Sequence, residues 1–396
     1  MDKKMYKYIA ILVGLLVLLM LFMWISNLLS GGKTYTYEQV ENKMVSACKA
    51  YTNDNKGVLP SSPNTSTTVS VSTLVNGGYL DALSSYLNTD VNCSGSVEIY
   101  LASDGEYTYI PSLSCGNKYG TTKLSDKVIA DNGYGTVTGS GLYLRLNGSF
   151  VYDEDSLVSF GSDDEFEYVF RGDEVNNFVA IDDNYYRIVA INSNNDMLLI
   201  YTGHIQKAVT WDDRYNDVVG KNQGINIYEQ NGIKSRAMEA VESFYSGEAV
   251  LNNKEAYSDK TRYLTVPMNL CVGKRKETDT DISGQIECSL ILENQNAGLL
   301  PAYYYMSASL DDNCKTISSK NCGNYNYLSQ FEDNWWLLTA NSEVTNESYM
   351  VSRKYAESAL CSYKSYIRPT IMLSSRTVYD GGTGTEADPY IVKYSR

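Results

Sequence analysis

Residues 9–29 read IAILVGLLVLLMLFMWISNLL, and the interpretation of the rest of the chain depends on this uncharged run. At about 1.5 Å per residue, a helix of this length spans the roughly 30 Å hydrocarbon core of a bilayer. Lys3, Lys4 and Lys7 precede the run, and a short basic flank stays in the cytoplasm. A cleaved signal peptide is the alternative, but its apolar region would be shorter, and residues 26–30 (SNLLS) form a poor cleavage site. The sequence therefore predicts an uncleaved single-pass anchor in the cell membrane, with a cytoplasmic N-terminus and extracellular C-terminal domains.

The charge of the remaining chain argues against nucleic acid as a partner. Residues 1–33 contain four Lys and one Asp and carry +3, so the formal net charge of −14 leaves −17 on residues 34–396. Such a charge repels phosphate backbones. The chain contains 35 Tyr but one His, and Tyr offers binding surfaces a large contact area at low entropy cost. The composition favours an extracellular, β-rich binding protein, and the length favours two or more domains.

All eight cysteines lie after the apolar run, where an oxidising exterior permits disulfides. No C-x-x-C motif occurs and a single His cannot complete a Cys/His zinc site, so we expect neither a metal nor a cofactor. Sequence neighbours that flank short, turn-rich segments predict three pairs: Cys93–Cys115, Cys271–Cys288 and Cys314–Cys322. Cys48 fits a helix core, whereas Cys361 is either free or paired differently, so the full connectivity stays open.

An amphipathic helix is predicted after the Gly31-Gly32 joint, in the stretch TYEQVENKMVSACKAYTNDN. Its apolar residues recur at helical spacing: Val40, Met44, Ala47, Cys48 and Tyr51. Thr36 with Gln39 fits a capping box at the start. Residues 97–101 and 107–110 then read as two strands of a hairpin, whose ends the Cys93–Cys115 pair would close.

This order of an apolar helix, an amphipathic helix and a small sheet with a Cys pair resembles the layout of pilins and pseudopilins. It is most similar to pilin-like modules of membrane-anchored Gram-positive surface proteins. The resemblance covers about residues 35–118 and includes the motif TLVNGGYL at 73–80. The chain departs from the family at the processing site, because no Gly precedes Ile9 and Gly14 lies inside the apolar run.

Residues 119–166 are interpreted as a connecting region. The stretch LYLRL at 142–146 and the turn at 147–149 predict a β-hairpin. Residues 153–167 contain seven acids and are interpreted as a solvated acidic loop. Calcium is an alternative use for so many oxygen atoms, but the spacing of an EF-hand loop is missing.

The C-terminal stretch begins with a clear hairpin. YYRIVAI at 185–191 and MLLIY at 197–201 are apolar strands separated by a polar turn. Residues 233–245 carry an apolar stripe at helical spacing, and Gly247 provides a helix stop.

A second resemblance rests on motifs that occur in a fixed order: FRGDEVNNFVAIDDNYYRIVAI, WDDRYN, AGLLPAYYYMSAS, NWWLLTAN, IRPTIMLSS and GGTGTEADPYIV. They are similar to a bacterial surface domain of uncharacterised function. The WWLL and RPTIML elements resemble the C-type-lectin-like and formylglycine-generating-enzyme-like folds. The resemblance spans about 167–396 and implies a lectin-like domain without naming its ligand.

The predicted fold class is therefore α+β. An N-terminal transmembrane helix continues into a pilin-like helix with a small antiparallel sheet, and a larger β-rich lectin-like domain follows. The predicted boundaries are 1–32 for the cytoplasmic flank and anchor, 33–118 for the pilin-like module, 119–166 for the connecting region and 167–396 for the lectin-like domain.

Candidate ligand-binding residues come from two aromatic clusters and one arginine. Trp211 lies beside two Asp, Arg214 and Asn216, so its ring could stack on a sugar while Arg214 binds a carboxylate. A structural turn is the alternative. Trp335 and Trp336 are either core strand residues, as in lectin-like folds, or stacking platforms. Arg368 precedes a strand and is expected to pair with a buried carboxylate or with carbonyl groups.

No catalytic residue is predicted. Any triad would need His204, the single imidazole, which lies on a turn and is interpreted as structural. The formylglycine-generating activity uses a reactive Cys pair, whereas Cys361 stands alone here. A pair of carboxylates for glycoside hydrolysis stays open, because their separation is invisible in a sequence.

The preferred hypothesis is a membrane-anchored extracellular binding or adhesion protein, not an enzyme, with a glycan or a protein as its ligand. The alternative is a minor pilin or pseudopilin that forms part of a filament or secretion apparatus. A cell-wall hydrolase is a third hypothesis, for which no residue pair can be named. The oligomeric state is not predicted.

Overall fold

The computed structural model describes residues 35–87, 92–102, 105–133, 139–152, 165–219, 223–251 and 259–393. The predicted anchor at 9–29 and most of the acidic run at 153–167 lie outside these residues. The described residues divide into two compact units, one within residues 35–121 and the other within residues 122–393.

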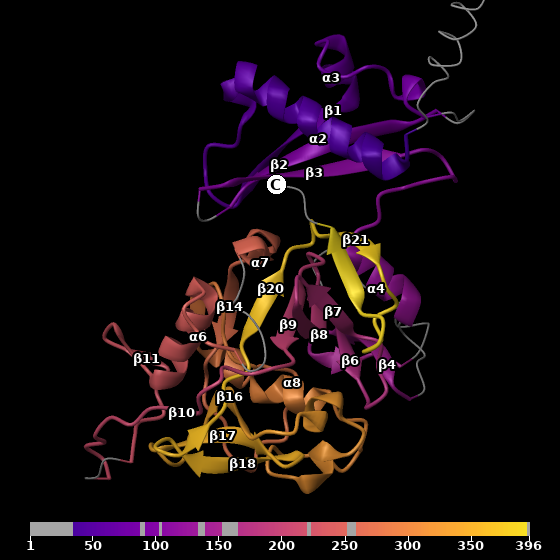
Figure 1. Cartoon of the computed structure of the whole chain (residues 1–396). Coiled ribbons are helices and arrows are strands. Elements are labelled where there is room, and N and C mark those ends of the chain that lie inside the picture. The colour runs from indigo at the N-terminus through magenta and orange to yellow at the C-terminus, as the bar shows by residue number, and fades with distance from the viewer. Residues whose placement is uncertain are drawn as a thin grey trace, which may run out of the picture. The chain divides into compact units, whose positions relative to one another are not determined.

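The first unit is one helix packed on a three-stranded antiparallel sheet. Helix α2 (Tyr37–Asp54) lies across strands β1 (Thr65–Ser70), β2 (Ser94–Leu101) and β3 (Tyr107–Ser114), which are ordered β1-β2-β3 (Figure 1). The unit also contains α3 (Val71–Asn76) and the short 3-10 helices η1 (Lys56–Val58) and η2 (Leu83–Ser85). The Cys93–Cys115 disulfide closes the ends of the β2–β3 hairpin, as the sequence predicted.

The core of the first unit joins the predicted helix stripe to the hairpin. Val40, Met44 and Cys48 of α2 are fully buried, in one cluster with Val97 and Ile99 of β2. Apolar residues at alternate positions lie on one face of a strand, and apolar residues three to four positions apart lie on one face of a helix. The two apolar faces therefore pack against each other in one layer.

The prediction that a transmembrane helix continues into the amphipathic helix is wrong. Thr36 has an extended backbone with φ −70° and ψ 158°, and its hydroxyl accepts a hydrogen bond from the Gln39 amide. The Gln39 side chain in turn accepts from the Thr36 amide, which completes the capping box. A helix that satisfies its first amides in this way begins there and does not extend an earlier helix. Of the helices in the described part of the chain, none combines the length and apolar composition of a membrane span.

The second unit is a β-rich α+β fold built on a ten-stranded sheet. Its main path is β13-β20-β9-β8-β6-β4-β5, and β7, β22 and β21 branch from β8. Neighbouring strands are antiparallel except for β22 and β7. The strands are β4 (Gly141–Leu146), β5 (Ser149–Phe150), β6 (Phe166–Arg171), β7 (Phe178–Ile181), β8 (Asn184–Asn192), β9 (Met197–Tyr201), β13 (Thr265–Val266), β20 (Thr370–Leu373), β21 (Val378–Gly381) and β22 (Tyr390–Lys393).

Smaller sheets and helices complete the second unit. β16 (Trp335–Ala340), β17 (Glu347–Ser352) and β18 (Tyr355–Leu360) form a separate antiparallel sheet, seen at the bottom of Figure 1. The two-stranded pairs are β10 (Val209–Thr210) with β19 (Lys364–Ser365), β11 (Glu229–Gln230) with β12 (Ile233–Lys234), and β14 (Met268–Cys271) with β15 (Ile291–Gln295). The helices are α4 (Leu124–Asn132), α6 (Arg236–Ser246), α7 (Asp259–Leu264), α8 (Ala302–Ser307), η3 (Glu287–Ser289), η4 (Lys320–Gly323) and η5 (Tyr327–Gln330).

Two local predictions are confirmed in this unit. β8 and β9 form the expected hairpin, and the Asn192 side chain holds its turn by accepting from the Asn194 and Asp196 amides. Helix α6 ends at Gly247 with φ +80°, a left-handed conformation that favours glycine. The structure also contains the expected Cys271–Cys288 and Cys314–Cys322 disulfides.

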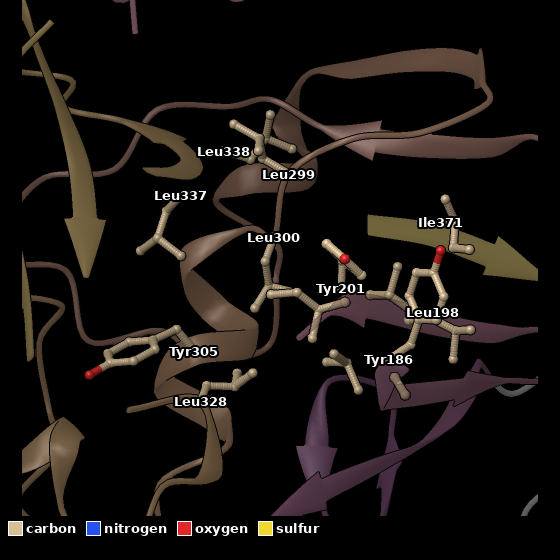
Figure 2. Packing of buried hydrophobic residues seen from close by; sticks show 14 of the residues in the cluster. Tyr186, Leu198, Tyr201, Leu299, Leu300, Tyr305, Leu328, Leu337, Leu338 and Ile371 are labelled. Atoms are coloured by element: carbon tan, nitrogen blue, oxygen red, sulfur yellow. The ribbon is translucent and has the colours of Figure 1, made fainter. Parts of the chain in front are cut away.

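The main core joins the large sheet to the loops that carry α8 and β16. Tyr186, Leu198 and Ile371 come from the sheet, whereas Leu300 and Leu337 come from the α8 and β16 side (Figure 2). Every residue of β9 and of β16 is buried, so both faces of these strands are covered.

A fully buried ion pair fixes the loop between β14 and β15. The Arg275 guanidinium donates to both carboxylate oxygens of Glu287 at 2.8 and 3.1 Å, and both side chains have zero exposure. The backbone of Arg275 hydrogen-bonds to Ala340 and Ser342, so the pair also holds the end of β16.

We expect Glu287→Gln to destabilise the second unit by about 3–5 kcal/mol, because the variant leaves Arg275 buried without a counter-charge. Chemical denaturation of the full chain measures the change. Glu239→Gln is the matched control, since its pair with Arg236 on α6 is half exposed on both sides and should contribute little. Equal effects of the two substitutions would contradict the importance of the buried pair.

Candidate functional site

The predicted tryptophans lie in the core and leave no ring for a ligand. Trp335 and Trp336 have zero exposure, and the Trp336 indole donates to the Val209 carbonyl oxygen at 3.1 Å. The Trp211 indole donates to the Leu337 carbonyl oxygen at 3.2 Å. The structure therefore uses these rings as packing residues beside β10 and β16. Core packing was one of the two interpretations considered for Trp335 and Trp336, whereas a structural turn was the alternative considered for Trp211.

The polar residues beside Trp211 form a turn. Both carboxylate oxygens of Asp212 accept hydrogen bonds from Arg214 Nε, at 3.0 and 2.8 Å, and Asp212 is buried. Asn216 donates to the Gly224 carbonyl oxygen at 2.9 Å. These bonds hold residues 212–216 in the structural turn that was the alternative considered for Trp211.

Arg368 lies near Asp333, which also contacts His204. Its guanidinium donates to the carbonyl oxygens of Thr202 and Gly203 and lies 3.8 Å from the Asp333 carboxylate. His204 Nδ1 lies 2.8 Å from the Ile205 carbonyl oxygen, and its Nε2 lies 3.1 Å from Asp333 Oδ2. These two contacts hold the His204 ring between the Ile205 backbone and the Asp333 side chain.

Three adjoining hollows mark the surface between β18 and β7. The hairpin hollow, of about 690 Å³, lies over the β17–β18 hairpin and is also lined by Asn334, Ser362 and Tyr363. The loop hollow, of about 430 Å³, lies along residues 323–332. The arginine hollow, of about 310 Å³, contains Arg187 and Arg368.

The hollows share their boundaries. Arg353 lines both the hairpin hollow and the loop hollow, whereas Gln330, Phe331 and Glu332 line both the loop hollow and the arginine hollow. Together they form a continuous succession of binding-sized spaces, each within the volume range of ligand pockets.

The tight β17–β18 turn separates the first two hollows. Arg353 and Lys354 have φ values of +55° and +116°, which side chains other than Asn and Gly rarely adopt. Neighbouring groups hold the turn: Tyr305 donates its hydroxyl to the Lys354 carbonyl oxygen at 2.9 Å. A Cβ at Gly323 would lie 1.8 Å from that same oxygen, so only glycine fits there. Strained turns of this kind often occur at functional sites.

The hairpin hollow presents aromatic rings beside hydrogen-bonding groups. Tyr363 is 50% exposed, Tyr355 is half-buried, and Leu360 adds an apolar side chain. Asn334, Glu357 and Ser358 provide polar atoms in the same space. Tyr355, Tyr363 and Asn334 were not among the predicted site residues, because tryptophans were chosen there as the stacking rings. The tyrosine beside Cys361 and the tyrosine that begins the strand YAESAL could have indicated this site.

The described residues offer no metal-binding cluster and no exposed thiol outside a disulfide. Among the described residues, no group of three or more His, Cys, Asp or Glu side chains could hold a metal ion. Cys48 and Cys361 are buried and outside any disulfide. Burial raises the pKa of the Cys48 thiol to about 11 and raises the pKa of Cys361 as well, where the nearby Asp212 carboxylate acts in the same direction. Both thiols therefore stay protonated at neutral pH.

Comparison of the chain with protein-family models, with curated proteins and with solved structures found no match.

We expect iodoacetamide at about pH 8 to leave Cys48 and Cys361 unmodified in the folded chain, because the thiolate is the reactive form and burial suppresses it. Peptide mass mapping measures the modification, and the same reaction in denaturant serves as the control. Rapid alkylation of Cys361 in the folded chain would contradict the structural role given to it.

Proposed function

We propose that the second unit binds an extracellular glycan in the hairpin hollow. The observation that carries this proposal is the combination of Tyr355 and Tyr363 with Asn334, Glu357 and Ser358 around one space of about 690 Å³. Sugar rings have an apolar face of C–H groups and a rim of hydroxyl groups. An aromatic ring can cover the face while amide, carboxylate and hydroxyl side chains bind the rim.

The disulfides support an extracellular location for this binding. One lies in the first unit and two lie in the second, and such bonds persist in oxidising environments outside the cytoplasm. The formal net charge of −14 argues against nucleic acids and other polyanions as ligands.

A binding role fits the chemistry of the hollow better than hydrolysis. Among the described residues, Glu357 provides the one carboxylate that lines the hairpin hollow. Hydrolysis of a glycosidic bond by general acid–base catalysis needs two carboxyl groups. A single carboxylate can accept hydroxyl hydrogen bonds without cleaving the ligand.

We expect a glycan-array screen of the full chain to identify a ligand, and Tyr363→Ala to weaken its binding by at least about tenfold, or about 1.4 kcal/mol, through loss of ring stacking. Isothermal titration calorimetry measures the affinity. Tyr215→Ala is the matched control, because Tyr215 is 54% exposed and lies on the turn beside Arg214.

Two results would contradict the proposal. The first is a glycan array on which the chain binds no glycan. The second is a ligand whose affinity falls with Tyr215→Ala and not with Tyr363→Ala, which would place the site at the turn that begins with Trp211.

A further inference from the structure

The arginine hollow contains two buried guanidinium groups that have few close hydrogen-bond or ion-pair partners among the described residues. Arg187 is 4% exposed and Arg368 is 3% exposed. Each guanidinium lies against an aromatic ring, Arg187 at 4.1 Å from the Phe178 centroid and Arg368 at 4.1 Å from the Phe331 centroid. The same two rings line the hollow, so the space has both apolar walls and cationic ends.

Arg187 has only neutral hydrogen-bond partners among the described residues. Its Nε donates to Asn177 Oδ1 at 2.7 Å, but its two terminal nitrogens reach Gln330 Oε1 and the Val175 carbonyl oxygen only at 3.4 Å. Bonds of that length are weak. The terminal nitrogens of Arg187 can therefore exchange these contacts for a stronger acceptor.

Arg368 is engaged mainly by carbonyl groups. Its Nη1 donates to the Thr202 and Gly203 carbonyl oxygens, and its buried Nε has no partner within the described residues. The Asp333 carboxylate lies 3.8 Å away but is bound more closely by His204. Burial lowers the pKa of both arginines to about 10, with nearby carboxylates opposing the shift. A buried cation in this state is stabilised by an added carboxylate.

A simple anion would meet unfavourable charges in the same space. Glu332 and Glu386 are exposed and line the hollow, together with Asp333. Their charges repel an anion and attract an ammonium group. The ligand that satisfies both sets carries a carboxylate and an ammonium a short distance apart, with an apolar part for Phe178 and Phe331.

We propose that the arginine hollow binds a free α-amino acid with an apolar side chain. Arg187 and Arg368 bind its carboxylate, Glu332 and Glu386 bind its ammonium group, and the side chain lies against Phe178 and Phe331. The volume of about 310 Å³ is at the small end of ligand pockets and suits a ligand of this size. This site shares no lining residue with the hairpin hollow, so it does not depend on the proposed glycan site.

The competing explanation is purely structural. Arg368 connects residues 202–203 to Phe331, and Arg187 connects Asn177 to Tyr327, so both could serve only to hold loops. A structural network has no preference among dissolved ligands. The test therefore compares ligands that differ by one charged group.

The experiment titrates the full chain with leucine, N-acetylleucine, leucinamide and 4-methylpentanoate by isothermal titration calorimetry. The last three lack, in turn, the ammonium charge, the carboxylate and the amino group. We expect leucine to bind at least about tenfold more tightly than each of them. Absence of leucine binding, or equal binding of leucine and 4-methylpentanoate, overturns the proposal.

Two substitutions in the arginine hollow and one control outside it test where leucine binds. Glu386 lies on the exposed rim, and Glu386→Gln should weaken leucine binding severalfold, whereas Glu239→Gln on the exposed face of α6 should leave it unchanged. Arg187→Gln should abolish binding, with thermal unfolding as the check that the variant folds. If that variant does not fold, the rim substitution decides, and leucine binding that is insensitive to Glu386→Gln overturns the assignment.

Discussion

A buried guanidinium group is costly unless acceptors engage its N–H groups, and the acceptors that do so connect distant parts of the second unit. Five arginines there are less than a tenth exposed: Arg145, Arg171, Arg187, Arg275 and Arg368. Arg145 and Arg275 are paired with Glu167 and Glu287, whereas Arg171 donates to the carbonyl oxygens of Ser307 and Ser309. These bonds connect residues that are distant in the sequence. They hold the long, loop-rich stretch between β14 and β16 in a defined arrangement on which the hollows depend.

The disulfides act on the same loops. Cys271–Cys288 encloses the segment that contains both Arg275 and Glu287, and Cys314–Cys322 closes the loop before η5. A covalent link limits the unfolded chain, whereas the buried ion pair selects one conformation of the folded loop. The hollows are therefore formed by segments that have little regular secondary structure but many fixed partners. Binding sites on rigid loops of this kind lose little conformational entropy when a ligand binds.

Much of the local structure could be predicted from the sequence, because it depends on neighbouring residues. The Thr36–Gln39 capping box, the β8–β9 hairpin and the Gly247 helix end each follow from a few adjacent side chains. The three disulfides followed from short loops. The expected continuation of the apolar run into α2 was wrong because the capping box, although recognised, was not taken as the start of a separate helix.

The candidate site could not be predicted in the same way, because it is assembled from distant segments. The Trp211 and Trp336 indoles donate to carbonyl groups more than a hundred positions away in the sequence, and this pairing places both rings in the core. The arginine hollow similarly joins β7, β8 and the residues after η5. The residues next to Arg187 and Phe331 in the sequence do not indicate that these two side chains line the same hollow.

Buried arginines and disulfides should hold the loops of the second unit in one conformation before any ligand binds. Hydrogen–deuterium exchange of the free full chain, followed by mass spectrometry, measures this directly. Because of these fixed partners, amides of residues 320–334 and of the β17–β18 hairpin should exchange slowly, at rates close to those of the β8–β9 hairpin. Exchange of the loop and hairpin amides within seconds, while β8 and β9 stay protected, would contradict this expectation.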